Sequence, residues 1–75
     1  MFVMDTQSPL STLSRVRPLT SPKRVLVVED EAEIRQLIVL HLKREGFFVE
    51  ETGDGEAARR MLLAQSYDLV VLDWM

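Results

Sequence analysis

Two short, unbroken apolar runs, each followed directly by acidic residues, constrain the fold of this chain more than any other feature. They cover residues 25–28 and 69–72, and the acidic residues that follow them are Glu29, Asp30 and Asp73. Runs of this length, rich in valine and leucine, are typical of strands buried on both faces of a parallel sheet. The sequence therefore predicts two inner strands with carboxylates at their carboxyl ends.

The segment between the first run and Gly46 is predicted to be an amphipathic helix. Asp30 and Glu33 fit a D-x-x-E capping box at its start, and Gly46 is the expected left-handed terminator. The apolar residues of its predicted inner face recur at helical spacing and are Ile34, Leu37, Ile38 and Leu42. His41 lies at the margin of this face, where it is expected to pack and not to bind a metal.

A second strand and a second helix are predicted before the second apolar run. Residues 47–49 favour a short strand, and residues 52–55 a loop. The helix that follows would turn Ala57, Ala58, Met61 and Leu62 inward. The order β-α-β-α-β predicts an α/β fold, a doubly wound parallel sheet with the first strand between the other two. The carboxyl ends of these strands share one edge, so Glu29, Asp30 and Asp73 should converge there.

Residues 1–22 are expected to be a disordered leader, with the domain at residues 23–75. The leader is rich in Ser, Thr and Pro, and its few apolar residues keep neither a helical nor a strand period. The domain has seven Lys or Arg residues against eleven Asp or Glu residues, so no direct nucleic-acid contact is expected. The chain has no cysteine and no membrane-length apolar run, which favours a cytoplasmic protein without membrane contact.

Three carboxylates at one edge indicate a cation site with phosphoryl chemistry. Clustered carboxylates raise one another's pKa unless a cation lies between them. Mg²⁺ is a hard ion that binds through one or two carboxylates and keeps waters that phosphate oxygens can displace. Beside such an ion, one carboxylate can attack a phosphoryl donor and form an aspartyl phosphate.

Residues 23–75 resemble the receiver domains of bacterial two-component response regulators, throughout the stretch KRVLVVEDEAEIRQLIVLHLKREGFFVEETGDGEAARRMLLAQSYDLVVLDWM. The resemblance implies a flavodoxin-like fold in which Glu29 and Asp30 are the acidic pair and Asp73 is the phospho-acceptor. It also implies a bound Mg²⁺, with Glu29, Asp30, Asp73 and the backbone carbonyl of Met75 as its protein ligands.

The resemblance implies partners as well. A sensor histidine kinase would donate the phosphoryl group, and the chain would accept it without being a turnover enzyme. Trp74 and Met75 after the acceptor are similar to the branch whose receivers control a C-terminal winged-helix DNA-binding domain. Control of transcription, and a homodimer of the full-length protein on phosphorylation, are the expected consequences.

Compared with that family, the sequence is expected to hold the first three strands and two helices of the domain. The family's switch Ser or Thr and its phosphate-binding Lys lie on later strands, so the chain by itself is not expected to be competent for phosphoryl transfer. The third strand would also keep one unpaired apolar edge. We therefore expect that the isolated chain does not fold stably.

Three other functions fit parts of the sequence. Residues 53–58 formally match G-x-G-x-x-A of dinucleotide-binding enzymes, but Asp54 and Glu56 place negative charge where the pyrophosphate would lie. A phosphatase resembling the haloacid dehalogenase family needs a second acid two residues after the nucleophile, where Met75 stands. A receiver-like module that binds partners without being phosphorylated stays open.

Overall fold

The computed structural model describes residues 1–5 and 22–73. Its elements, in chain order, are β1 (Phe2–Asp5), β2 (Arg24–Glu29), α2 (Ala32–Arg44), β3 (Phe48–Thr52), α3 (Gly55–Ala64) and β4 (Leu69–Asp73). From β2 onward this is the β-α-β-α-β order that the sequence predicts.

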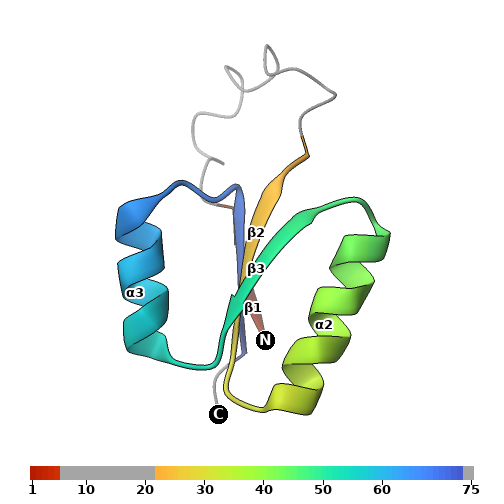
Figure 1. Ribbon diagram of the computed structural model, residues 1–75, viewed down its shortest axis with the longest axis horizontal. Coiled ribbons are helices and arrows are strands. Elements are labelled where there is room, and N and C mark those ends of the chain that lie inside the picture. Colours follow the sequence, from red (N-terminus) through yellow and green to blue (C-terminus); the bar gives the residue numbers. More distant parts are fainter. Residues whose placement is uncertain (6–21, 74–75) are drawn as a thin grey trace.

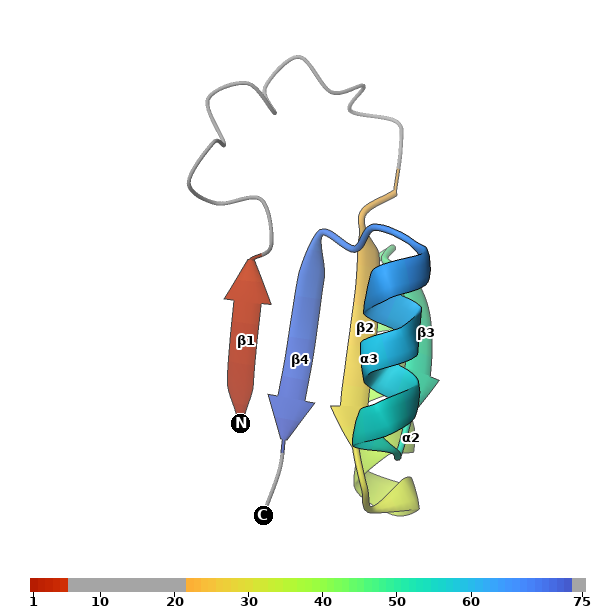
Figure 2. The same ribbon diagram turned by 90° about the vertical axis from the view of Figure 1, so that its left-hand side faces the viewer.

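The four strands form one sheet in the order β1-β4-β2-β3 (Figure 2). β2 pairs in parallel with β3 on one side and with β4 on the other. The predicted position of the first domain strand between the other two is therefore confirmed, and the described residues have the flavodoxin-like arrangement. β1 pairs antiparallel to β4, so the sheet as a whole is mixed.

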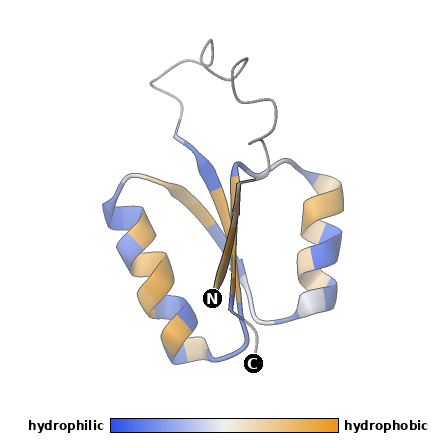
Figure 3. Ribbon diagram, turned by 180° about the vertical axis from the view of Figure 1, so that it is seen from behind, coloured by the Kyte–Doolittle hydropathy of each residue, from blue (hydrophilic) through white to orange (hydrophobic). Residues whose placement is uncertain are grey.

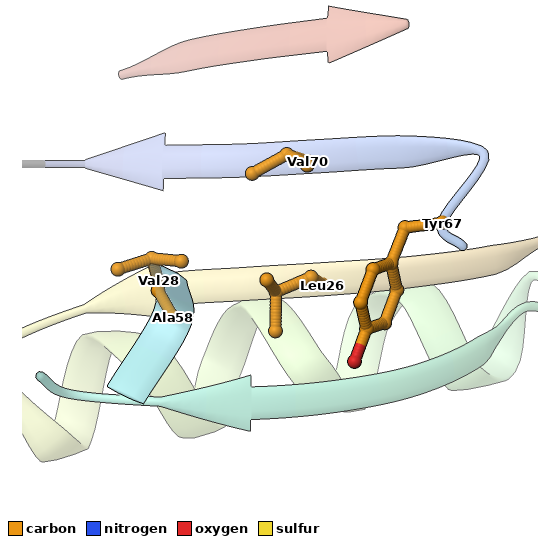
Figure 4. Close-up of a cluster of buried hydrophobic side chains, with 5 residues drawn as sticks. All are labelled: Leu26, Val28, Ala58, Tyr67 and Val70. Carbon is orange, nitrogen blue, oxygen red and sulfur yellow. The ribbon is translucent and has the colours of Figure 1, made fainter. Parts of the chain in front are cut away.

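The two helices cover opposite faces of the sheet (Figure 1). Alternate residues of β2 point to opposite sides, as the period of two in a strand requires. Leu26 and Val28 belong to the cluster on the α3 side, which contains Ala58, Tyr67 and Val70 as well (Figure 4). Val25 and Val27 belong to the cluster on the α2 side, with Val39 and Val71. β2 is thus buried on both faces, which explains its unbroken apolar run.

Helix α2 differs from the prediction in its start and in its buried face. Its N-cap is Glu31, and among the described residues no side chain caps it, so the predicted Asp30–Glu33 capping box is wrong. Val39 is buried, whereas Ile34 and Leu37 are exposed, Leu37 by 67%. The reason is that α2 packs mainly on β2 and β3, so the apolar residues of its face that lie past these two strands are left uncovered.

An open groove lies on each face of the sheet, on its β1–β4 side. Apolar residues that α2 and α3 do not cover form its walls. The groove beside α2 has a volume of about 620 Å³, and its walls are Met1, Val3, Leu37, Ile38, His41, Leu42, Leu69 and Val71. The groove beside α3 measures about 300 Å³ and contains Leu62, a residue predicted to be inward that is exposed here. Both helices carry hydrophobic and hydrophilic residues along their length (Figure 3).

Helix α3 begins with a cap that the sequence analysis did not assign. The Asp54 side chain accepts a hydrogen bond of 3.2 Å from the backbone N–H of Glu56. Glu56 also forms an ion pair of 3.5 Å with Arg59 three residues later. Asp54 therefore satisfies one of the free N–H groups at the helix start.

Strand β1 corrects part of the predicted leader. Residues 1–22 were expected to be disordered, but Phe2–Asp5 is a strand whose residues pair with Leu72 through Leu69 of β4. The cause is the edge of β4, which would otherwise present free backbone groups beside apolar side chains. The apolar segment from Phe2 to Met4 covers that edge (Figure 2). The rest of the leader, residues 6–21, lies outside the described residues.

Candidate functional site

The site is built at the carboxyl ends of β2 and β4. Glu29 is the last residue of β2, Asp73 is the last residue of β4, and the two are register partners in the parallel pairing. Adjacent strands lie about 4.8 Å apart, so the two carboxyl groups start from neighbouring backbone positions. The structure thus brings together two acids that are far apart in the sequence, at the edge where the sequence analysis expected them.

The acidic residues differ in their access to solvent. Glu29 is buried, with 2% of its surface exposed, whereas the Asp73 side chain is 26% exposed. Asp30 directly follows Glu29 and is exposed. A reactant arriving from solvent can therefore reach Asp73 and Asp30, but Glu29 is shielded from it.

The Glu29 carboxyl group has close acidic neighbours. Its Oε2 accepts a hydrogen bond of 2.9 Å from the backbone N–H of Glu31. This bond lowers the pKa of Glu29, but contact with the Asp30 side chain, burial, and contact with the Asp73 carboxylate together raise the pKa above its ordinary value of 4.5. The site therefore concentrates negative charge that a cation would relieve.

A positive group lies beside Asp73. The α-ammonium of Met1 is 3.8 Å from Oδ1 of Asp73, since the antiparallel pairing of β1 places its amino end beside the carboxyl end of β4. Figure 2 shows the two chain segments side by side. Both partners are partly exposed, so solvent weakens this attraction.

Arg35 is a site residue that the sequence analysis missed. Its Nη1 donates a hydrogen bond of 2.8 Å to the backbone carbonyl of Glu29, and its Nε lies 3.1 Å from Oε1 of Glu51 on β3. A signal for it existed in the sequence: a cation near the amino end of a helix is unfavourable to the helix dipole, so its presence there indicates another role.

The donor set at this edge suits a hard divalent cation. The available side-chain ligands are carboxylate oxygens, and magnesium needs only one or two of them besides water. Within residues 1–5 and 22–73, no group of three or more His, Cys, Asp or Glu side chains is arranged to hold a metal. Glu29, Asp30 and Asp73 are therefore neighbours in the described structure without forming a ready three-ligand cage. Met75, the predicted carbonyl ligand, lies outside the described residues, as does Trp74.

Two other expectations can be compared with the structure. At the G-x-G-x-x-A match, the carboxylate of Asp54 already accepts the N–H that a pyrophosphate would use, which disfavours a dinucleotide there. In the described part of the chain, neither helix combines the length and the apolar character that crossing a bilayer requires.

The chain is similar to proteins of one known family. The family described as the response regulator receiver domain matches residues 25–75. Transcriptional regulatory protein ResD of Bacillus subtilis is 41% identical over 56 residues, which cover 75% of this chain and 23% of ResD. Alkaline phosphatase synthesis transcriptional regulatory protein SphR of Synechococcus elongatus is 40% identical over 84 residues, covering 93% of this chain and 33% of SphR.

A third relative is also a transcriptional regulatory protein by name. Phosphate regulon transcriptional regulatory protein PhoB of Escherichia coli is 43% identical over 53 residues, 71% of this chain and 23% of PhoB. The chain thus spans a third or less of the length of these three relatives. No solved structure gives a significant match.

Proposed function

The chain belongs to the response regulator receiver domain family, and from this premise we propose that Asp73 accepts a phosphoryl group in a magnesium-dependent reaction. Glu29, Asp30 and Asp73, with the backbone carbonyl of Met75, would hold the ion. The observation that carries the proposal is the pairing of Glu29 with Asp73 at the carboxyl ends of neighbouring strands.

The choice of Asp73 as acceptor rests on access and charge. Its side chain is partly exposed, whereas Glu29 is buried, so a phosphoryl donor in solvent can reach Asp73 but not Glu29. An Asp73 carboxylate oxygen forms the new O–P bond as the donor's bond to phosphorus breaks, and the departing group takes up a proton. Glu29 and Asp30 would bind and orient the magnesium ion. When bound, Mg²⁺ would neutralise the acidic cluster and the charge of the incoming phosphoryl group.

The partners follow from the family and from the relatives. We propose that a sensor histidine kinase in the cytoplasm donates the phosphoryl group from a phosphohistidine. The three relatives reported above are transcriptional regulators by name. A winged-helix DNA-binding domain under the control of this receiver, and a homodimer formed on phosphorylation, complete the proposal. Phosphorylation would then shift a two-state equilibrium that controls the output domain, so this is a signalling reaction and not a turnover activity.

Labelling of the full-length protein by radioactive acetyl phosphate tests the acceptor assignment. We expect Mg²⁺-dependent incorporation in the native protein and none in Asp73→Asn. Asp54→Asn is a matched control, because it removes another aspartate carboxylate while asparagine still caps helix α3. Its labelling should equal that of the native protein.

Two results would contradict the proposal. Labelling that survives in Asp73→Asn would place the acceptor elsewhere. A native protein that folds and yet takes up no label with Mg²⁺ would favour the other candidate, a receiver-like module that binds partners without phosphorylation.

A further inference from the structure

We propose that Arg35 is a positioning residue, which fixes the acidic turn after β2 so that Asp30 and Glu29 can hold a divalent cation. This inference deepens the function proposed above and rests on it. The acidic turn is defined here as residues 29–31. Arg35 itself donates to a carbonyl and a carboxylate, so it acts on the site through the backbone of that turn.

Arg35 joins three elements at the site. Its guanidinium extends from α2, donates to the carbonyl of Glu29 at the end of β2, and pairs with Glu51 on β3. The Arg35 side chain is 20% exposed, so most of it is packed between these elements. A planar guanidinium donates in fixed directions, which lets it set the geometry of two acceptors at once.

Gly53 provides the space for this arrangement. A Cβ atom at position 53 would lie 2.6 Å from Nη1 of Arg35 and 3.4 Å from the carbonyl oxygen of Glu29. The first distance is too short for a real contact, so a side chain there would push the guanidinium away from the turn. The absence of a side chain at this position is thus linked to the Arg35–Glu29 hydrogen bond.

The acidic turn depends on the hydrogen bond from Arg35 to Glu29, because helix α2 starts without a side-chain cap within the described residues. The carbonyl of Glu29 and the N–H of Asp30 belong to one rigid peptide plane. A hydrogen bond to that carbonyl therefore also fixes the backbone from which the Asp30 side chain extends. Inside the turn, the N–H of Glu31 holds the Glu29 carboxylate at 2.9 Å. Arg35 holds the turn from outside.

Magnesium affinity measured by NMR on the full-length protein tests the inference. Loss of a residue that hydrogen-bonds to metal ligands and orients them typically costs about 10–100-fold in metal affinity, so Arg35→Gln should weaken Mg²⁺ binding by about tenfold or more. Before magnesium is added, the backbone amide signals of Asp30 and Glu31 in Arg35→Gln should already be shifted from their positions in the native protein. Arg59→Gln is the matched control, since it also removes an arginine paired with a glutamate, but on the exposed face of α3. It should bind magnesium as the native protein does.

Gly53→Ala tests the same contact without removing a charge. The atom nearest to the added methyl group is the end of a flexible side chain, so the protein should fold with Arg35 displaced. We expect Gly53→Ala to weaken magnesium binding, as Arg35→Gln does. Arg35→Lys should bind magnesium more tightly than Arg35→Gln but less tightly than the native protein. These two variants decide the question even if Arg35→Gln does not fold.

The outcomes separate the two proposals. If the folded Arg35 and Gly53 variants bind magnesium with native affinity and show only a lower melting temperature, Arg35 is merely structural and the inference is overturned. If the native full-length protein binds no magnesium, the proposed function fails, and the inference fails with it.

Discussion

Glu29 and Asp73 are the last residues of two neighbouring parallel strands and lie at the same register position. Glu29 is buried, whereas the Asp73 side chain is partly exposed to solvent. This relationship has a thermodynamic consequence, because burial and a neighbouring acid both disfavour the ionised form of Glu29 and raise its pKa. In the absence of a cation, folding therefore carries an electrostatic cost at this edge of the sheet.

The first prediction concerns the pH dependence of stability. The pKa of Glu29 is raised above 4.5, so the folded state holds its proton more tightly than the unfolded state does. The contribution of Glu29 to stability should therefore be complete below 4.5, its value in the unfolded chain, and should be lost as the pH rises through the higher folded-state pKa. Asp73→Asn removes one cause of the raised pKa and should flatten this decrease, which melting curves between acidic and neutral pH without magnesium can measure. A steeper decrease in the variant would contradict the prediction.

The second prediction concerns Asp30. Asp30→Ala should weaken magnesium binding and slow labelling by acetyl phosphate, because it removes an exposed carboxylate beside Glu29. The fold should survive, because β2 ends before this residue. Glu31→Ala is the matched control: it removes the adjacent acid but keeps the backbone N–H that bonds to Glu29. If the two variants lose equal affinity, general charge and not the position of Asp30 explains the effect.

The third prediction concerns the opposite end of the sheet. The buried Tyr67 hydroxyl donates to the Glu50 carboxylate and accepts a hydrogen bond of 3.2 Å from Gln65. Tyr67→Phe keeps the ring in the core but loses a hydrogen bond to a charged group, which should reduce the free energy of unfolding by about 1.5–3 kcal/mol. Urea denaturation at neutral pH measures this difference.

The same tyrosine predicts a loss of stability at high pH. Burial, followed by the hydrogen bond to Glu50 and its charge, raises the pKa of Tyr67 from 10.0 to about 12. The neutral hydroxyl is therefore favoured in the folded state, and its contribution is complete below 10.0 and lost as the pH rises through about 12. Tyr67→Phe should lack this part of the alkaline decrease. Parallel alkaline curves for the two proteins would show that the buried hydroxyl does not titrate in this way.

The fourth prediction concerns the end of helix α2. Gly46 has a φ of +94° and nothing within 4 Å of the position where a Cβ would stand, so the backbone alone determines the cost of a side chain there. Gly46→Ala should reduce stability by about 1–2 kcal/mol, and Gly46→Asn by less, because asparagine tolerates the left-handed region better than alanine does. Thermal unfolding of both variants checks the order. Equal losses would indicate that backbone conformation is not the cause.

The sequence predicted the three parallel strands and the position of the acids, because both depend on local patterns. Unbroken apolar runs indicate strands buried on both faces, and β2 is such a strand. Once the winding is known, the convergence of Glu29 and Asp73 follows from where their strands end. Gly46 was predicted correctly as a left-handed terminator because its conformation is a property of the residue itself.

The features that the sequence analysis missed depend on contacts between distant segments. The hydrogen bond from Arg35 to Glu29 needs the space left by Gly53 in the loop after β3, and helical spacing does not reveal that space. Leu37 fits the apolar period of α2, yet it faces an open groove because α2 does not extend over that part of the sheet. Spacing predicts which residues share a face of a helix, but it does not predict how much of that face is covered.

The fifth prediction concerns strand β1, which the sequence analysis assigned to a disordered leader. β1 pairs with the outer edge of β4, where Val3 lies opposite Val71 and Met4 opposite Val70. Neighbouring strand residues direct their N–H groups to opposite sides, so replacing both Val3 and Met4 with proline removes at least one hydrogen bond to β4. That loss should reduce stability by about 1 kcal/mol. It should also expose the apolar edge of β4, so the variant should aggregate more readily.

Light scattering during a thermal melt measures both effects of the proline pair. Replacing Val3 and Met4 with threonine is the matched control, because threonine is β-branched and keeps its backbone N–H, so β1 can still pair. The threonine variant should melt and scatter much like the native protein, although it loses apolar surface at the same two positions. If both variants aggregate equally, the apolar side chains of β1 protect the sheet. If only the proline variant does so, the protection comes from the backbone pairing that closes the edge of β4.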